Sequence, residues 1–321
     1  HLHKEIVSTV KTIRHLRGNC NHTWREPAEW AVKYSHMKNR PAKALTITLT
    51  PTGCEWADKG GCTMCGEFEG SRKSVVVSDD FHIAQFSSAV AKYVSEYKPV
   101  WLRIEQEGNY TNPKEMGLEA QISILRLAGL LKGIKRITIE SRPKYLTNEV
   151  VNLLKNTLKD SNVELEIGMG LEAENDVVRN VCINKGESKE DFIRAVSLLT
   201  ENGILPLAYV LLKPPFLTEG EAIEEAINTI RFATDIGFKR ISIEPMSIHK
   251  YTLVDALYNA GCYQVPWLWS VLEVAINCRD VAELGIGGVG YYPRPRNLCQ
   301  NHHKNNSPNC NKKVWEALRQ F

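Results

Sequence analysis

Apolar and polar positions follow two alternating periods along most of the chain. Short runs rich in β-branched and apolar residues predict buried strands, and the longer stretches between them have the period of amphipathic helices. We expect six strands, at 44–50, 100–105, 136–140, 163–169, 207–212 and 240–244. Helices are expected at 79–97, 113–131, 147–158, 174–181 with 189–202, and 219–236, and most of them follow a Ser, Thr, Asp or Asn residue that can cap a helix.

Repeated strand, helix and strand units predict a parallel sheet, because the helix of each unit carries the chain back to the same edge. Periodicity alone does not separate an open doubly wound sheet from a curved barrel. No low-complexity linker divides the alternation, so we expect one catalytic domain over 41–290. It is flanked by an N-terminal extension, 1–40, with a possible helix over 27–36, and by a tail, 291–321, rich in Pro, Asn, His and Lys.

The composition is that of an ordinary globular protein, with 43% hydrophobic and 24% charged residues in 321. A net charge of +3 gives no support for nucleic-acid binding through overall electrostatics, although a local basic face is compatible with it. No apolar run approaches the length of a membrane helix, and the first residues lack the apolar core of a signal peptide. We therefore expect a cytoplasmic protein whose nine cysteines are reduced and serve partly as metal ligands.

Three cysteines follow the first predicted strand on one glycine-containing loop. Cys54, Cys62 and Cys65 can bind three irons of a [4Fe–4S] cluster, because thiolates are the soft ligands that iron–sulfur centres take. No fourth cysteine lies nearby in the sequence, so the fourth iron would stay open to chelate the amino and carboxylate groups of S-adenosylmethionine (SAM). Two alternatives are a zinc site, which would need a fourth protein ligand, and thiols that only pack.

The spacing of seven and then two residues between these cysteines departs from the three-then-two spacing common in radical SAM enzymes. Other segments nevertheless resemble the archaeal radical SAM proteins related to the Elongator catalytic subunit, and most closely the radical SAM subunits of archaeosine synthase, often called RaSEA. The segments that carry the resemblance are 53–66, 107–110, 139–143, 170–172 through 184–186, 211–219 and 266–270. The run Leu-Leu-Lys-Pro-Pro-Phe-Leu-Thr-Glu at 211–219 is the most specific of them.

The resemblance implies a partial (β/α)6 barrel of the radical SAM type, in which a reduced [4Fe–4S] cluster cleaves SAM to a 5′-deoxyadenosyl radical. It implies a lyase that cleaves a C–N bond of a lysine–deazaguanine adduct in tRNA to form archaeosine. A partner subunit would install the lysine, and a donor such as ferredoxin or flavodoxin would supply the electron. Alternatives are a radical SAM enzyme acting on a sugar or amino acid derivative, an Elongator-like tRNA modifier without an acetyltransferase domain, and a non-catalytic protein with a structural zinc.

Polar residues that follow predicted strands are the candidates for binding SAM or substrate, because ligands of parallel β/α folds sit at the carboxyl ends of the strands. They are Gly108, Asn109, Glu140, Arg142, Glu172, Arg179, Lys185 and Lys213, with Glu107 as a weaker candidate. Lys213 and Glu172 are also the candidates for catalytic roles. The alternatives are a plain loop at 107–109, pairing of Glu140 and Arg142 with each other or with a neighbouring helix, and a solvated helix face for Arg179 and Lys185.

Three further groups of residues have less distinctive patterns. Glu244, Pro245 and Met246 close the last predicted strand, where related folds hold adenine by backbone contacts. Trp267 and Trp269 either stack on a flat substrate or belong to the core. A possible second metal site in the tail comprises Cys299, His302, His303 and Cys310, and the cysteines left over, which are expected to pack as thiols, are Cys20, Cys182, Cys262 and Cys278.

Overall fold

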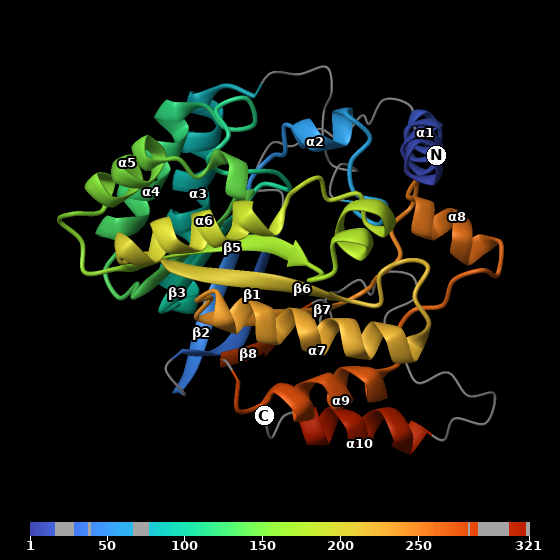
Figure 1. The fold of residues 1–321 in the computed structure, drawn as a ribbon. Helices are drawn as coiled ribbons and strands as arrows, with labels where there is room; N and C mark the ends of the chain where they lie inside the picture. Colours follow the sequence, from blue (N-terminus) through green and yellow to red (C-terminus); the bar gives the residue numbers. More distant parts are fainter. Residues whose placement is uncertain (17–28, 38–39, 67–76, 282, 288–307, 319–321) are drawn as a thin grey trace.

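A curled eight-stranded sheet organises the protein (Figure 1). The structure is a computed structural model that describes residues 1–321 except 17–28, 38–39, 67–76, 282, 288–307 and 319–321. The strands are β1 (Glu29–Met37), β2 (Arg40–Thr48), β3 (Trp101–Glu105), β4 (Arg136–Glu140), β5 (Glu164–Glu172), β6 (Leu205–Leu212), β7 (Arg240–Pro245) and β8 (Glu283–Ile286). They lie side by side in chain order, with β1 antiparallel to β2 and every later pair parallel.

Helices connect the parallel strands and cover the outer face of the sheet (Figure 1). They are α3 (Asp79–Tyr97), α4 (Leu118–Leu130), α5 (Asn148–Thr157), α6 (Lys189–Glu201) and α7 (Glu219–Asp235), with α9 (Leu268–Cys278) and α10 (Pro308–Leu318) stacked beyond α7. Side-chain caps open several of them, as the sequence predicts, and the structure shows in addition that Ser188 and Thr218 each form a reciprocal capping box with the third helical residue. None of the helices in the described part of the chain is long and apolar enough to cross a membrane.

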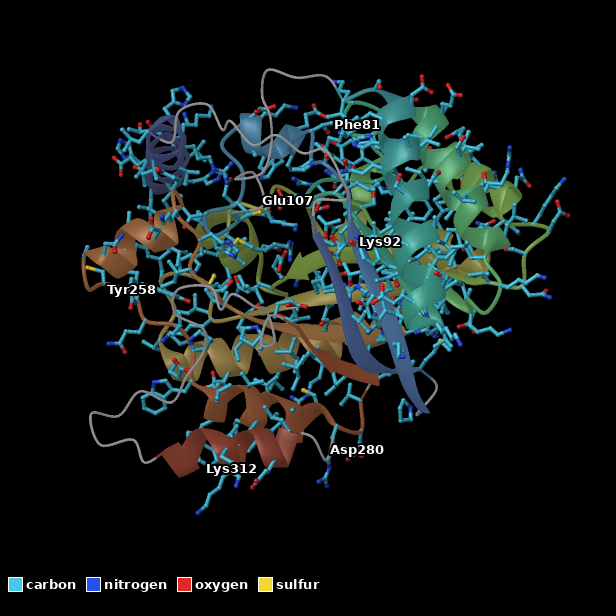
Figure 2. All side chains as sticks on the ribbon, turned by 180° about the vertical axis from the view of Figure 1, so that it is seen from behind. Phe81, Lys92, Glu107, Tyr258, Asp280 and Lys312 are labelled. Atoms are coloured by element: carbon cyan, nitrogen blue, oxygen red, sulfur yellow. The ribbon has the colours of Figure 1, made fainter. Side chains whose placement is uncertain are left out.

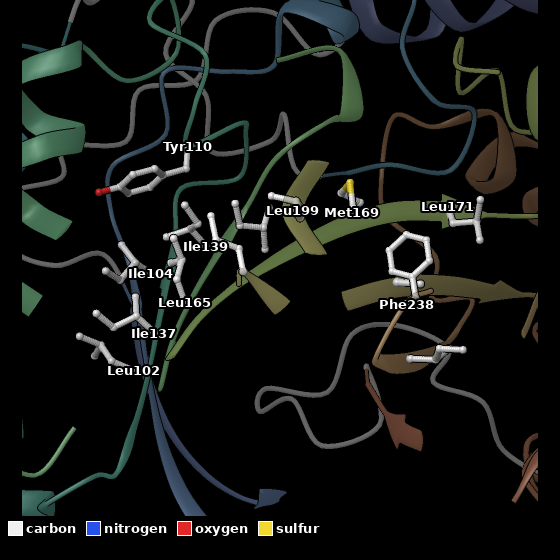
Figure 3. Packing of buried hydrophobic residues seen from close by; sticks show 14 of the residues in the cluster. Leu102, Ile104, Tyr110, Ile137, Ile139, Leu165, Met169, Leu171, Leu199 and Phe238 are labelled. Carbon is white, nitrogen blue, oxygen red and sulfur yellow. The ribbon is translucent and has the colours of Figure 1, made fainter. Parts of the chain in front are cut away.

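Every second residue of the strands faces the helices and forms the main core. In β3, β4 and β5 these positions are Leu102, Ile104, Ile137, Ile139, Leu165, Ile167, Met169 and Leu171, all of them buried. Figure 3 shows most of them with Tyr110, Leu199 and Phe238, which pack on the same side. Because side chains alternate across a strand, the residues between these positions point to the concave side of the sheet.

The concave side is closed at the amino ends of the strands by a buried polar cluster, here called the floor cluster. Its members are Trp101, Arg136, Thr138, Glu166 and Arg240. The Glu166 carboxylate accepts hydrogen bonds from Arg240 at 3.0 and 2.8 Å and from the Thr138 hydroxyl at 2.7 Å, and it forms an ion pair with Arg136. Both guanidinium groups lie over the Trp101 ring, at 5.2 and 4.5 Å from its centroid. The four strands that contribute these residues are thereby tied together from inside.

The N-terminal extension takes part in the fold in two places. Helix α1 (Leu2–His15) packs beside α8 (Leu253–Asn259), where Ile6, Val10 and Leu253 form a small buried cluster (Figure 1). Strand β1 occupies most of the segment 27–36, for which we expected a possible helix, so that expectation is wrong. Strand β1 pairs along its whole length, Glu29–Met37, with β2, and this tertiary pairing outweighs a weak local preference for helix.

The six expected strands are confirmed as β2 to β7, and the partial barrel is confirmed as a curled sheet that also includes β1 and β8. The helix expected at 174–181 is instead a single π-helical turn, η3 (Val178–Cys182). Such turns are rare and occur frequently at functional sites. Here the turn leads directly into residues 183–187, which contact the cysteine loop.

Candidate functional site: a thiol loop at the carboxyl ends of the strands

The loop after β2 carries the three predicted cluster ligands. Cys54 precedes the short helix α2 (Glu55–Asp58), and Cys62 and Cys65 follow it. All three are partly exposed, and none forms a disulfide within the described residues. Between α2 and Cys62 the chain turns through Gly60 and Gly61, with φ values of 123° and 67° that side-chain-bearing residues rarely adopt. The glycines let the loop fold back so that three sulfurs come from one short segment.

Segments from two distant parts of the chain hold this loop in place. The buried Arg14 of α1 donates hydrogen bonds to the carbonyls of Ala57, at 3.1 Å, and Cys62, at 2.9 Å. From the other side, the Asn184 side-chain amide donates to the Gly61 carbonyl at 2.7 Å, and the Trp56 indole donates to the Asn184 carbonyl at 2.8 Å. The loop therefore has a fixed backbone path, which a rigid metal cluster requires of its ligands.

The charges around the loop suit thiolate ligands. Burial raises the pKa of Cys62, while the cations of Lys185 and Arg142 act to lower it. Burial lowers the pKa of Arg14, and the sulfurs of Cys65, Cys62 and Cys54 act to raise it. Three cationic side chains thus lie near three sulfurs and offset the negative charge that the sulfurs would carry as thiolates.

No three His, Cys, Asp or Glu side chains in the described ranges converge on a point that a single metal ion could occupy. A cubane cluster requires no such convergence, because each thiolate binds a different iron. The donor set of three thiols, spread over one loop and surrounded by cations, therefore fits a [4Fe–4S] cluster.

Three of the predicted residues meet beside the loop. The Lys185 ammonium lies 3.0 Å from the Glu172 carboxylate, and the pair is buried. Burial is the largest single influence on the pKa of Lys185 and acts to lower it, but Glu172, Cys62 and Glu187 together outweigh burial and leave that pKa raised. Arg142 donates to the Lys185 carbonyl at 2.5 Å and to the Glu187 carboxylate at 2.9 Å, and its guanidinium lies 4.9 Å from the centre of the Trp56 ring. Of the alternatives for Arg142, a direct ion pair with Glu140 is therefore not formed, and Arg142 pairs with Glu187 just before α6.

Backbone strain marks the same edge of the sheet. Glu107, Glu172 and Lys213 each follow or end a strand, and each has a positive φ, of 57°, 64° and 69° respectively. Non-glycine residues in this region cost free energy and cluster at active sites and ligand-binding sites. Figure 2 shows Glu107 between the strands and α2, which begins next to Cys54. Three predicted residues therefore adopt an unusual backbone geometry at the edge where we expect SAM.

Lys213 and its neighbours form the other end of this edge. Its ammonium lies 2.6 Å from the Glu219 carboxylate at the start of α7, and Tyr263 donates to its backbone carbonyl at 2.6 Å. The Trp267 amide and the Ser270 hydroxyl donate to the other Glu219 oxygen. Glu219 therefore connects Lys213 to the start of α9.

The turn after β3 is tied to the cysteine loop by Glu115, which the sequence did not single out. Its carboxylate accepts hydrogen bonds from the Asn109 amide and side chain and, at 3.0 Å, from the amide of Glu55, the residue after Cys54. A Cβ at Gly108 would lie 3.0 Å from the carbonyl oxygen of Gly53 and still closer to Glu115. Gly108 is therefore required for the approach of the two loops, while Asn109 positions Glu115.

Two predicted residues lie away from the thiols. Glu140 points to the concave side, where its carboxylate accepts a 2.6 Å hydrogen bond from the Tyr209 hydroxyl. Arg179 is fully buried rather than solvated, and it donates to the carbonyls of Ala173, Glu174 and Glu187. In this position Arg179 holds the π turn against the end of β5.

The remaining candidates fall into two groups. Trp267 and Trp269 are 37% and 42% exposed, so they do not belong to the core. Cys278, in contrast, is packed in the core. Glu244 is half-buried and accepts a hydrogen bond from the Ser242 hydroxyl. Cys20, Cys299, His302 and His303 lie outside the described residues, as does the side chain of Cys310. Arg14, Asn184 and Glu187 were not predicted, since nothing in their local sequence shows that they meet the thiol loop.

Solved structures share the curled sheet at low sequence identity. Elp3 of Methanocaldococcus infernus, lacking its N-terminus, matches with a TM-score of 0.54 and 12% identity, over 74% of this chain and 59% of that one. A radical SAM methyltransferase from Sphaerobacter thermophilus matches with a TM-score of 0.51 and 14% identity, over 84% and 76% of the two chains. SuiB of Streptococcus suis, solved with SAM bound, also has a TM-score of 0.51 and 14% identity, over 74% and 48%. No family model matches the chain.

Sequence relatives are considerably closer. A protein of Methanocaldococcus jannaschii is 32% identical over 99% of this chain and 87% of its own length. Archaeosine synthase subunit beta of Thermococcus kodakarensis is 31% identical over 75% of this chain and 74% of its own. The same subunit of Methanosarcina acetivorans is 34% identical over 72% of this chain and 66% of its own.

The curled parallel sheet with a three-cysteine loop at its carboxyl edge defines a radical SAM enzyme. Within that class, the chain belongs to the family of archaeosine synthase beta subunits.

Proposed function

We propose that this chain is the lyase that cleaves the C–N bond of a lysine–deazaguanine adduct in tRNA and so forms archaeosine. The proposal extends to this chain the archaeosine synthesis for which its relatives are named, and assigns the C–N cleavage step to it. It includes a [4Fe–4S] cluster on Cys54, Cys62 and Cys65 with SAM at its open iron, and a cytoplasmic location. These three cysteines would hold the cluster, and the cluster with SAM would supply the one-electron chemistry that generates a radical able to remove a hydrogen atom from substrate.

The observation that carries the proposal is the fixed path of the thiol loop next to the polar strand ends. Arg14 and Asn184 hold the loop by its carbonyls, so the three sulfurs stay in one arrangement as a cluster binds. Lys185 and Arg142 offset the negative charge of the thiolates. Glu172 and Lys213, held in strained conformations at the same edge, are the groups that would orient SAM.

The partners follow from the same relatives. Their name describes one subunit of an archaeosine synthase, which supports a second subunit that attaches lysine to the base before this chain acts. We also propose ferredoxin or flavodoxin as the electron donor. The catalytic unit predicted over 41–290 would work together with the extension 1–40, since α1 contacts the cluster loop and β1 extends the sheet.

Anaerobic turnover with nucleoside mass spectrometry tests this function. The reconstituted protein is incubated with SAM, a reductant and tRNA that carries the lysine adduct, and archaeosine and 5′-deoxyadenosine are measured together. We expect equal amounts of both products and slow SAM cleavage without RNA. Deuterium on the lysine carbon next to the broken bond should appear in 5′-deoxyadenosine. Its absence despite turnover, or equal activity on a free small-molecule adduct, would contradict the proposal.

A further inference from the structure

Cys62 lies against the segment that follows the π turn. The Asn184 side-chain amide donates to the carbonyl of the residue before Cys62 at 2.7 Å, and the amide of Thr63, the residue after it, donates to the Ile183 carbonyl at 2.8 Å. Cys62 is thus bracketed by two hydrogen bonds to this segment. The contacts fix the backbone of the next residue, Lys185, beside one of the three predicted cluster ligands.

Both ends of Lys185 are held in place. Its carbonyl accepts a hydrogen bond from Arg142 at 2.5 Å, and its ammonium group lies 3.0 Å from the Glu172 carboxylate. The two charged groups lie over Gly170 of β5, where an added Cβ would collide with both of them. Each of the two side chains is 11% exposed. The ion pair is therefore fixed and largely removed from water, which screens its charges less than it screens those of a surface pair.

The positive end of this ion pair faces the thiol loop. Burial raises the pKa of Cys62, and among the charged side chains around it Lys185 acts most strongly against that rise, whereas Glu172 adds to it. Arg142 acts in the same direction as Lys185 but more weakly, and its own charge is paired with Glu187. These opposite influences indicate that the ammonium group lies nearer to the sulfur than the carboxylate does.

Such an arrangement affects electron uptake by a cluster bound to Cys62. A [4Fe–4S] cluster gains one negative charge when it takes up one electron. A cation near a thiolate ligand stabilises the reduced form more than the oxidised form and so raises the reduction potential, whereas a carboxylate lowers it. Because the ammonium group of Lys185 is the nearer of the two charges, the ion pair as a whole favours reduction.

We propose that the buried Lys185–Glu172 ion pair sets the reduction potential of the cluster, with Lys185 raising the potential and Glu172 lowering it. The inference rests on the proposed function, because it takes Cys62 as an iron ligand. Lys185 acts through the cluster and not on the substrate, which makes it a positioning residue. The electron comes from the proposed ferredoxin or flavodoxin, and the ion pair determines how strong a reductant this carrier must be.

A redox titration of the reconstituted protein, followed by electron paramagnetic resonance without SAM, tests this role. Because SAM is absent, altered SAM binding cannot contribute to the result. Lys185→Met should lower the equilibrium constant for one-electron reduction by about tenfold or more, and tenfold corresponds to about 59 mV. Glu172→Gln should raise the potential, and the double variant should fall between the two single variants. Lys185→Arg keeps the positive charge and should have a potential close to that of the wild type.

Lys189→Met is the matched control. Lys189 also forms an ion pair with a glutamate, Glu174, but its ammonium group lies over the Phe232 ring of α7, 5.4 Å from the ring centre. Lys185→Met and Lys189→Met each remove one lysine from such a pair, so a general loss of stability would affect both. The reduction potential of Lys189→Met should equal that of the wild type. Iron content and near-UV circular dichroism confirm that each variant keeps its cluster and its fold.

The outcomes separate this role from the proposed function. Equal reduction potentials in Lys185→Met and the wild type overturn the proposal, and so does a shift of both single variants in the same direction. If Lys185→Met does not retain iron, Glu172→Gln decides, because it keeps the ammonium group and should still have a raised potential. If the potentials shift as expected while modified tRNA gives no archaeosine, the role of the ion pair stands and the proposed function fails. If archaeosine forms and the potentials do not shift, the function stands and this role fails.

Discussion

The Arg14 guanidinium donates a hydrogen bond to the carbonyl of Cys62, which lies 48 residues further along the chain, at a distance of 2.9 Å. The contact joins the first helix to one of the three predicted cluster ligands. A Cβ at Gly61 would collide with the same guanidinium, so the loop and the arginine fit closely. The N-terminal helix therefore packs against the candidate site and contacts the thiol loop directly.

Replacing Arg14 by Gln should loosen the thiol loop while leaving the sheet intact. The change removes two charge-assisted hydrogen bonds, each typically worth about 1.5–3 kcal/mol. Hydrogen exchange of the cluster-free protein should be at least about tenfold faster in residues 54–66, where local opening controls exchange. His15→Gln changes an exposed neighbour on the same helix and should leave exchange unchanged. Equal protection in Arg14→Gln and the wild type would show that α1 does not hold the loop.

Each of the three loop cysteines should be necessary for the cluster. Ala in place of Cys54, Cys62 or Cys65 removes one iron ligand, and we expect loss of the brown cluster absorbance and of all reductive SAM cleavage. The exposed Cys262, replaced by Ala, serves as the control and should retain iron and activity. If Cys62→Ala kept a full complement of iron and released 5′-deoxyadenosine normally, the assignment of the cluster to these three cysteines would be wrong.

Lys213→Met should weaken SAM binding about tenfold or more and leave the iron content unchanged. The substitution also breaks the ion pair between Lys213 and Glu219. Glu219→Gln is therefore the matched comparison, because it breaks the same ion pair but keeps the Lys213 ammonium. Equilibrium dialysis of SAM against both variants separates the two effects. We expect Glu172→Gln and Arg142→Gln to behave like Lys213→Met in turnover. Equal SAM affinity in Lys213→Met and the wild type would exclude Lys213 from the cofactor site.

Glu166→Gln should destabilise the fold in a pH-dependent way. Burial alone would raise the pKa of Glu166, but Arg240 and Arg136 hold it below the usual 4.5. The ionised carboxylate therefore stabilises the fold fully above pH 4.5, and this contribution is lost as the pH falls below 4.5 through the depressed pKa. Breaking a buried ion pair costs about 3–5 kcal/mol.

Urea unfolding at several pH values measures this effect. The difference in unfolding free energy between the wild type and Glu166→Gln should be largest near neutral pH and shrink in acid. Glu224→Gln, at an exposed position of α7, should show no such difference. A constant difference across the pH range would mean that the floor cluster does not depend on an ionised Glu166.

The parts of the fold that the sequence predicted well have strong local signals. Helix α3 begins and ends where its amphipathic pattern and the Ser78 cap place it, and the parallel strands β2 to β7 follow apolar runs. Helix α1 was missed because its buried positions, Ile6, Val10 and Arg14, include a charged residue that breaks the apolar period. Strand β1 was taken for a helix, since an antiparallel edge strand is defined by its partner more than by its own residues.

The candidate site likewise has residues with a local sequence signal and residues that only the folded structure brings together. Cys54, Cys62 and Cys65 could be proposed as cluster ligands because all three lie on one loop, and that loop is where the structure places them. Glu172 and Lys213 could be placed at the carboxyl edge because Glu172 ends β5 and Lys213 directly follows β6. The partners Glu187 and Glu219, and the meeting of Arg103 with Tyr209, arise from the curvature of the sheet and from packing between distant segments. No local pattern encodes such contacts.

The order of the strands in space, which equals their order in the chain, has a consequence for biogenesis. A ribosome delivers the N-terminal part first, so each new strand finds its neighbour already made. The cysteines and Arg14 emerge before β3, whereas Arg142, Asn184 and Lys185 emerge with and after β4 and β5. Until then the thiols lack the residues that enclose them. If these thiols hold the proposed cluster, iron and sulfide can reach a nascent chain whose ligand loop is still open, and synthesis of the next segments then encloses the loop.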